Sequence, residues 1–251
     1  MVLGCSLVME TGVRLAANNG YLPAPFTCRD YLHRMQAYRL TGGAIVSGSF
    51  QAFGQSYLLA ALTELGPGFV GVTQIPASTT DDEILALDRA GIRAMRFNLK
   101  RGGSEDIRHL DRLARRVHEL AGWHVELYAD SRELAPIYPL LRALPALSID
   151  HLGLSGEGFP TLLRLAEHGA RVKATGFSRV GFDVAQALKD LYHANPEALM
   201  FGTDLPSTRA PKPYEDADFG LVIETLGLKG AEQVFYANAA KFYRLSPETL
   251  R

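Results

Sequence analysis

The feature that most constrains this fold is an alternation of short strand-like runs with helical patterns along the 251 residues. Apolar runs typical of buried strands alternate with segments whose apolar residues recur at a helical period. The strand-like runs occupy residues 2–8, 43–47, 69–75, 94–99, 124–129, 146–150, 171–175 and 199–203. The helical patterns occupy residues 30–38, 56–65, 81–90, 104–121, 133–143, 160–168, 184–193 and 215–226, and a ninth follows at 231–243.

Eight strand–helix units in this length average about 31 residues each, which is a typical size for a βαβ unit. No long linker or shift in composition interrupts the series, so we predict an α/β fold with one domain over residues 1–251. The expected architecture is a single (β/α)8 TIM barrel with an extra C-terminal helix. An open, doubly wound sheet is the alternative, because the number of strands alone does not prove that the sheet closes.

Charge and composition bear on the class of protein. The 26 Lys and Arg residues nearly balance 27 Asp and Glu residues, so no electrostatic reason predicts nucleic acid or an anionic membrane as a partner. No run approaches the roughly 18 apolar residues of a membrane span. The two cysteines, Cys5 and Cys28, are too few for a disulfide framework. We expect a cytoplasmic protein whose oligomeric state the sequence does not indicate.

In a barrel of this kind the active site lies at the carboxyl ends of the strands. The period of two predicts that Arg96 and Asn98 point into the barrel from the fourth strand. A buried arginine needs an anion, which is either a protein carboxylate or a substrate. From the fifth strand, His124, Glu126 and Tyr128 point inward. The first two can satisfy each other, whereas Tyr128 at the upper end is a candidate for the site.

Two more candidates follow the sixth and eighth strands. His151 is placed to ligate a metal, act as a general base or donate a hydrogen bond to a carbonyl. Asp204 can activate water or bind a metal, although aspartate also commonly begins turns. The cations that we expect at the same face are Arg96, Lys100, Arg101, Arg179, Arg209 and Lys212. Clustered cations, and arginines above all, favour a small carboxylate-bearing substrate.

Six segments of the chain resemble the amidohydrolase superfamily, and specifically its branch similar to 2-pyrone-4,6-dicarboxylate lactonase. They are GIRAMRFNL at 91–99, WHVELYAD at 123–130, IDHLG at 149–153, KATGFSR at 173–179, FGTDLP at 201–206 and YANAAKFYRL at 236–245. The resemblance covers essentially the whole chain, with the segments in the family's order. It implies a TIM-barrel hydrolase that opens a carboxylated lactone.

The resemblance also implies roles for individual residues. Asp204 matches the general base that takes a proton from the attacking water, and His151 matches a histidine that polarises the scissile carbonyl. The positions implied to contact the substrate are Arg96, Tyr128, Arg179, Tyr21, Ser47 and Ser49. The alternatives are an amidohydrolase that decarboxylates an aromatic acid and a non-catalytic descendant that binds a carboxylate.

The first strand departs from the family's pattern. The superfamily carries Asp-x-His-x-His there, whereas Cys5 and Leu7 occupy the positions of the two histidines. Leu154 stands where the branch carries an arginine. With so few ligands left, we expect no tightly bound catalytic metal and an activity that is weak or altered. The alternative is a zinc ion held by Cys5, His151 and Asp204.

Overall fold

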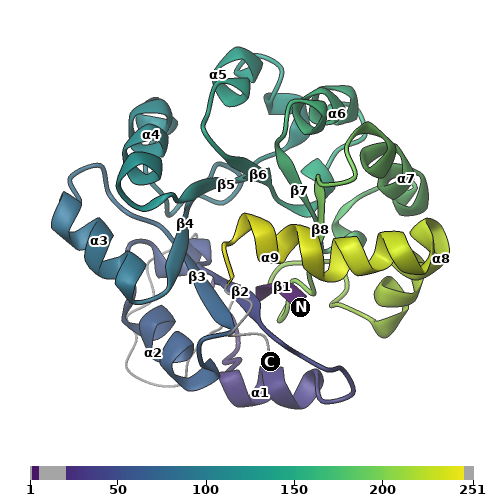
Figure 1. Ribbon diagram of the computed structural model, residues 1–251, viewed down its shortest axis with the longest axis horizontal. Helices are drawn as coiled ribbons and strands as arrows, with labels where there is room; N and C mark the ends of the chain where they lie inside the picture. Colours follow the sequence, from purple (N-terminus) through teal and green to yellow (C-terminus); the bar gives the residue numbers. More distant parts are fainter. Residues whose placement is uncertain (1, 6–20, 246–251) are drawn as a thin grey trace.

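The computed structural model describes residues 2–5, for which it gives the backbone, and residues 21–245. Within these ranges eight strands form one parallel sheet, in which each strand pairs with its neighbours in sequence. The first strand also contacts the eighth, so the sheet closes. The helices surround the strands in Figure 1. The predicted (β/α)8 barrel is therefore confirmed.

The elements follow the predicted order. The strands are β1 (Val2–Cys5), β2 (Gly43–Val46), β3 (Phe69–Thr73), β4 (Ile92–Asn98), β5 (His124–Tyr128), β6 (Leu147–Ile149), β7 (Arg171–Ala174) and β8 (Leu199–Phe201). The α-helices of the described residues are α1 (Cys28–Arg34), α2 (Ser56–Leu65), α3 (Asp81–Arg89), α4 (Leu110–Ala121), α5 (Tyr138–Arg142), α6 (Phe159–Glu167), α7 (Val184–Ala194), α8 (Asp216–Glu232) and α9 (Asn238–Phe242).

Local chemistry sets the helix ends. Thr80 caps α3 and accepts from the backbone N–H of Glu83, whose carboxylate accepts from Thr80 in return. Two predicted helices begin later than expected. Ser104 accepts a hydrogen bond from the end of β4 instead of capping a helix, and α4 starts only at Leu110. Pro136 lies in the segment predicted as 133–143, and α5 starts after it.

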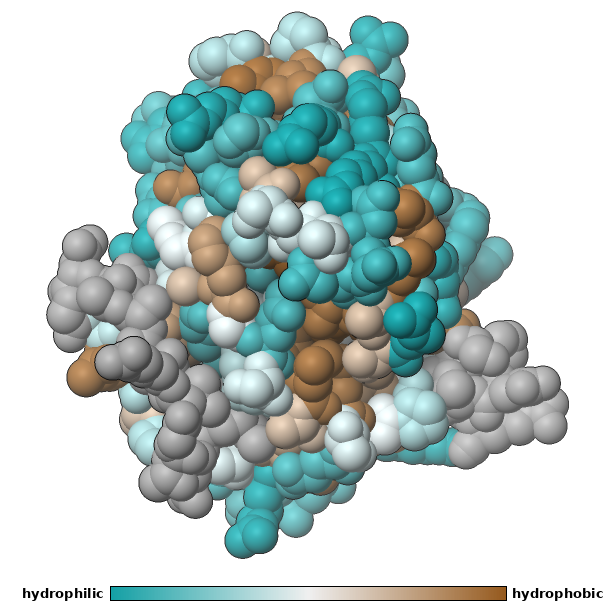
Figure 2. Space-filling view, turned by 90° about the vertical axis from the view of Figure 1, so that its left-hand side faces the viewer, coloured by the Kyte–Doolittle hydropathy of each residue, from teal (hydrophilic) through white to brown (hydrophobic). Residues whose placement is uncertain are grey.

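The outer face on the side of α3 and α4 is mostly hydrophilic, with separate apolar patches (Figure 2). Ion pairs cross this surface, because Arg115 lies 2.9 Å from Asp111 and Arg116 contacts Asp81. These contacts agree with a solvated face for the arginine-rich part of α4. Among the helices in the described ranges, none combines the length and the apolar character that crossing a membrane requires.

The extra C-terminal helix closes one end of the barrel. A short π-helical turn, η6 (Gln233–Ala237), leads into α9, which lies across the middle of the ring of helices in Figure 1. Ala239 and Tyr243 from this segment pack against inward side chains of β2, β3, β4 and β8. Burial of this apolar surface holds the helix against the barrel.

A series of charged side chains in contact with one another lies inside the barrel, next to the end that the C-terminal segment closes. Lys173 on β7 contacts Glu126 on β5, and its Nζ lies 3.1 Å from Asp150 Oδ1. Asp150 in turn accepts from Arg96 on β4 at 2.5 Å, and the Tyr243 hydroxyl donates to Glu126. Burial opposes the charge on Asp150, but Lys173 and Arg96 hold its pKa below the usual range. We call these four residues, Arg96, Asp150, Lys173 and Glu126, the interior charge chain.

Removing the Tyr243 hydroxyl tests whether α9 stabilises the interior charge chain. Tyr243→Phe keeps the ring but removes the hydroxyl that donates to buried Glu126. We therefore expect the free energy of unfolding to fall by about 1–3 kcal/mol. Urea denaturation followed by circular dichroism measures it. Tyr236→Phe, at a half-buried position of η6, is the control and should change stability by less than about 0.5 kcal/mol. Equal losses in the two variants would contradict this role of Tyr243.

Candidate active site

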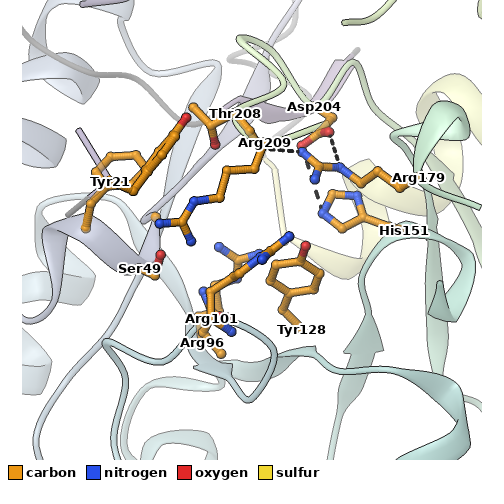
Figure 3. A pocket seen from close by; sticks show the side chains of 13 residues that line it. Tyr21, Ser49, Arg96, Arg101, Tyr128, His151, Arg179, Asp204, Thr208 and Arg209 are labelled. Carbon is orange, nitrogen blue, oxygen red and sulfur yellow. Dashed lines mark hydrogen bonds and ion pairs between the residues drawn. The ribbon is translucent and has the colours of Figure 1, made fainter. Parts of the chain in front are cut away.

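A pocket of about 400 Å³ opens at the carboxyl ends of the strands (Figure 3). The carboxyl-terminal parts of β4 and β5 and the segments that follow β2, β4, β6, β7 and β8 contribute to its wall, as expected for a barrel of this class. Of the residues predicted for the site, those that line the pocket are Tyr21, Ser49, Arg96, Tyr128, His151, Arg179 and Asp204. A second pocket of about 270 Å³ continues from Arg96, His151 and Asp204 toward Lys173 in the barrel interior.

Ser47 is the predicted contact that does not line either pocket. Its side chain is fully buried, and its hydroxyl lies 2.5 Å from the hydroxyl of Tyr57 on α2. Two of the predicted cations also lie elsewhere. Lys100 pairs with Asp130 at 3.1 Å, and Lys212 is exposed outside the lining of the pocket.

Asp204 is fixed by Arg179. Its Oδ2 accepts a hydrogen bond of 2.7 Å from Arg179 Nε, and Arg179 Nη2 donates to the Thr208 carbonyl at 2.9 Å. Gly176 makes this approach possible, since a Cβ there would lie 2.8 Å from Arg179 and 2.9 Å from Asp204. Asp204 Oδ1 lies 3.9 Å from His151 Nε2, which is longer than a hydrogen bond. Both of these atoms can therefore bind a ligand.

His151 begins the short turn η4 (His151–Gly153), which Asp150 links to the end of β6. Its Nδ1 is 2.8 Å from the Thr175 hydroxyl, and its ring meets the Tyr128 ring edge to face at 5.0 Å. Burial lowers the pKa of His151 to about 4, against an ordinary 6.5, even though Asp204 opposes the shift. The imidazole is therefore neutral at pH 7.

Strained backbone coincides with the reactive side chains. His151 has φ of 50° and Asp204 has φ of 56°, both in the left-handed region that non-glycine residues rarely adopt. Arg209, which also lines the pocket, has φ of 61°. Such conformations cost about 1–3 kcal/mol each and persist where the surrounding structure holds them, which is common at functional sites.

The sequence left open whether Arg96 pairs with a protein carboxylate or faces the substrate, and its position agrees with both. It pairs with Asp150 and donates to the Ser47 carbonyl at 2.7 Å, yet it also lines the pocket. Its guanidinium lies 5.1 Å from the centre of the Tyr128 ring, close enough for a cation–π contact. Arg96 Nε is buried without a hydrogen-bond partner among the described residues.

The pocket is strongly cationic. Its lining includes four arginines, which are Arg96, Arg101, Arg179 and Arg209, but Asp204 is its one carboxylate among the described residues. Arg101 is exposed, and no carboxylate of residues 21–245 lies within ion-pair distance of it. Arg209 stacks on Tyr21, with its guanidinium 3.9 Å from the ring centre. This arrangement favours a ligand that carries carboxylate groups.

The described donors do not fit a catalytic metal ion. Across residues 21–245, no three His, Cys, Asp or Glu side chains gather closely enough to bind one ion. Lys173, which lines the deeper pocket, is engaged by Glu126 and Asp150. The side chain of Cys5 lies outside what the structure describes, so the zinc site with Cys5, His151 and Asp204 stays a prediction, and Leu7 is also outside the described residues.

Sequence reasoning missed two threonines of the site. Thr175 follows β7 and contacts His151, while Thr208 lines the pocket and accepts from Arg179 through its carbonyl. The position of Thr175 at the end of a strand was the available signal, the same that identified His151. No pattern distinguished Thr208 within its loop.

The low pKa of His151 predicts a stability that depends on pH. In the unfolded chain His151 takes up a proton near pH 6.5, but in the folded protein it does so only near pH 4. Protonation therefore favours the unfolded state as the pH falls between these values. Between pH 7 and pH 5 this effect of His151 should lower the free energy of unfolding of the wild type by about 2 kcal/mol. Urea denaturation at both pH values measures it. His151→Gln should remove this part of the pH dependence, whereas substitution of the exposed His193 on α7, in His193→Gln, should retain it.

The amidohydrolase family model matches residues 9–245 of the chain. D-galactarolactone isomerase of Agrobacterium fabrum is 28% identical over 249 residues, which cover 91% of this chain and 84% of the isomerase. The 2-pyrone-4,6-dicarboxylate hydrolase of Comamonas testosteroni is also 28% identical, over 163 residues that cover 54% of this chain and 53% of that protein.

Solved structures share the barrel. One is a probable 2-pyrone-4,6-dicarboxylic acid hydrolase from Acinetobacter baumannii with citric acid bound. It superposes with a TM-score of 0.82 and 21% identity, covering 97% of this chain and 99% of the other. At this level of identity the similarity establishes the fold.

Proposed function

Because the chain belongs to the amidohydrolase family, we propose that it is a hydrolase that opens a carboxylated lactone with water activated by Asp204. The observation that carries the proposal is the meeting of Asp204 Oδ1 and His151 Nε2, 3.9 Å apart, in a pocket lined by four arginines. A lactone that carries carboxylates, such as 2-pyrone-4,6-dicarboxylate, has carboxylates that the arginines can bind and an ester carbonyl that can lie beside Asp204 and His151.

The arginines orient the substrate. Arg96 and Arg179 are each fixed by a carboxylate of the protein, so their positions are set before the substrate binds. Arg101 and Arg209 lie in the same wall and supply further positive charge. Guanidinium groups bind carboxylates through paired N–H donors, which positions the lactone carbonyl as well as attracting it.

Asp204 acts as the general base. Arg179 holds Oδ2, so Oδ1 accepts a proton from water as the water oxygen attacks the lactone carbonyl carbon. The electron pair of the carbonyl bond moves onto its oxygen. When the tetrahedral intermediate collapses, the ring C–O bond breaks and the ring oxygen takes the proton from Asp204. The product is a hydroxy acid or its enol equivalent.

His151 stabilises the developing oxyanion. Its neutral ring, fixed by Thr175 and by packing on Tyr128, presents Nε2 to the pocket beside Asp204. A preorganised donor aimed at developing negative charge is worth about 10²- to 10³-fold in rate. No step in this proposal passes through a metal ion, because the described donors do not fit one.

We also propose that the chain acts in the cytoplasm, in keeping with its two cysteines.

A second candidate is isomerisation of a lactone, which the 91% coverage by D-galactarolactone isomerase favours. In that reaction a hydroxyl of the substrate, rather than water, would attack the carbonyl, and Asp204 would deprotonate it. Reaction in ¹⁸O-labelled water separates the two. Hydrolysis places one labelled oxygen in the product carboxylate, and isomerisation places none.

Removing the proposed base tests the mechanism. Asp204→Asn keeps the shape of the side chain but cannot take a proton, so we expect kcat for 2-pyrone-4,6-dicarboxylate to fall by about 10²- to 10⁴-fold. Ring opening followed by ultraviolet absorbance measures it. Asp183→Asn, at the N-cap of α7, is the control and should keep kcat within about twofold. Carbon dioxide release would instead support the decarboxylase alternative, and saturable binding without turnover would support the non-catalytic alternative.

Arg101 tests the class of substrate. Its exposed guanidinium can be removed without leaving a buried carboxylate unpaired, unlike that of Arg96. Arg101→Gln should raise KM for the dicarboxylate by about 10-fold, the loss of one charge-assisted contact. KM for the uncharged diester should change by less than about twofold, and Arg108→Gln on the exposed turn before α4 is the matched control. Equal effects on the acid and its ester would refute a carboxylate contact.

A further inference from the structure

We propose that Thr175 is a positioning residue that holds His151 in the tautomer with its hydrogen on Nε2. The ring then presents an N–H donor, rather than a lone pair, to the substrate carbonyl. The catalytic consequence rests on the proposed function, but the tautomer itself is a property of the free protein.

Both partners are buried and fixed. Thr175 directly follows β7, and His151 is the second residue after the neighbouring strand β6. Thr175 is 2% exposed and His151 is 6% exposed. The distance of 2.8 Å between Thr175 Oγ1 and His151 Nδ1 is that of a direct hydrogen bond. Because burial keeps the imidazole neutral at pH 7, one ring nitrogen carries a hydrogen and the other a lone pair.

The hydrogen bond alone allows two arrangements, since a threonine hydroxyl can donate or accept. Asp204 distinguishes them. Among the charged groups near the ring, which are Asp204, Arg179, Asp150 and Arg96, Asp204 has the largest effect on its proton affinity. Its Oδ1 faces Nε2 at 3.9 Å, and a negative oxygen favours a hydrogen over a lone pair on that nitrogen. Nδ1 therefore accepts, and the Thr175 hydroxyl donates.

Other contacts fix the ring without choosing its tautomer. The Tyr128 ring packs edge to face against His151 at 5.0 Å, and the backbone at His151 and Leu152 has φ of 50° at both residues. These features orient the imidazole plane but offer no hydrogen to Nδ1. Asp204 favours hydrogen on Nε2, and Thr175 stabilises the same tautomer by donating to the lone pair on Nδ1.

Two variants separate the hydroxyl from the volume of the side chain. Thr175→Val keeps the shape and removes the donor, whereas Thr175→Ser keeps the donor. Nitrogen-15 NMR of the labelled imidazole reports the tautomer at pH 7 in the absence of substrate. We expect hydrogen on Nε2 in the wild type and in Thr175→Ser, and a larger population with hydrogen on Nδ1 in Thr175→Val than in the wild type, because the donor to Nδ1 is lost while Asp204 remains.

Activity provides the second measurement. With 2-pyrone-4,6-dicarboxylate as the probe, Thr175→Val should lower kcat by about 10- to 100-fold with KM within about twofold, because the donor acts on the oxyanion. Thr175→Ser should restore kcat to within about threefold of the wild type. A loss of kcat in Thr175→Val with no change of tautomer would overturn the proposal.

The spectra also separate this proposal from the proposed function. Hydrogen on Nδ1 in the wild type, or an unchanged Nε2–H tautomer in Thr175→Val, refutes the role of Thr175 whether or not a lactone is turned over. A wild-type protein without turnover but with the expected tautomers refutes the lactonase proposal and leaves the role of Thr175 supported. Thr175→Ala is a second variant without the hydroxyl if Thr175→Val does not fold.

Discussion

The interior charge chain is the constraint on which the rest of the barrel depends. Arg96, Glu126 and Lys173 lie on β4, β5 and β7, Asp150 directly follows β6, and each is almost fully buried. A buried charge without a partner costs several kcal/mol, so a shift of any of these strands by one residue would be strongly unfavourable. The interior charge chain thereby fixes the relative register of β4 to β7. This register determines where the residue at the end of each strand lies in the pocket.

This arrangement divides the arginines of the pocket by function. Arg96 and Arg179 are held by Asp150 and Asp204, and each shares its charge with a carboxylate of the protein. Arg101 lies farther out, exposed, so its charge contributes more directly to the attraction of an anion. Fixed inner groups and a cationic outer wall suit a site that first attracts a charged ligand and then holds it in one orientation.

Much of this was predictable because parallel strands leave clear signals. The period of two identified Arg96 and Tyr128 as inward residues, and the ends of β6 and β8 identified His151 and Asp204, which meet in one pocket. Ser47 was also a strand-end residue, but its hydroxyl bonds to Tyr57, a partner on a following helix that no local pattern reveals. Asp150 at the end of β6 pairs with both Lys173 on β7 and Arg96 on β4, and local sequence patterns do not reveal contacts between residues this far apart in the chain.

The contribution of α9 has a consequence for biosynthesis. Tyr243 completes the floor of the barrel and donates to Glu126, which is 117 positions earlier in the chain. A nascent polypeptide that has emerged only as far as β8 holds the buried carboxylate without this donor and exposes the apolar underside of its strands. Ribosome-bound intermediates are therefore expected to stay loosely packed and to need protection from aggregation until the segment around residue 243 clears the exit tunnel.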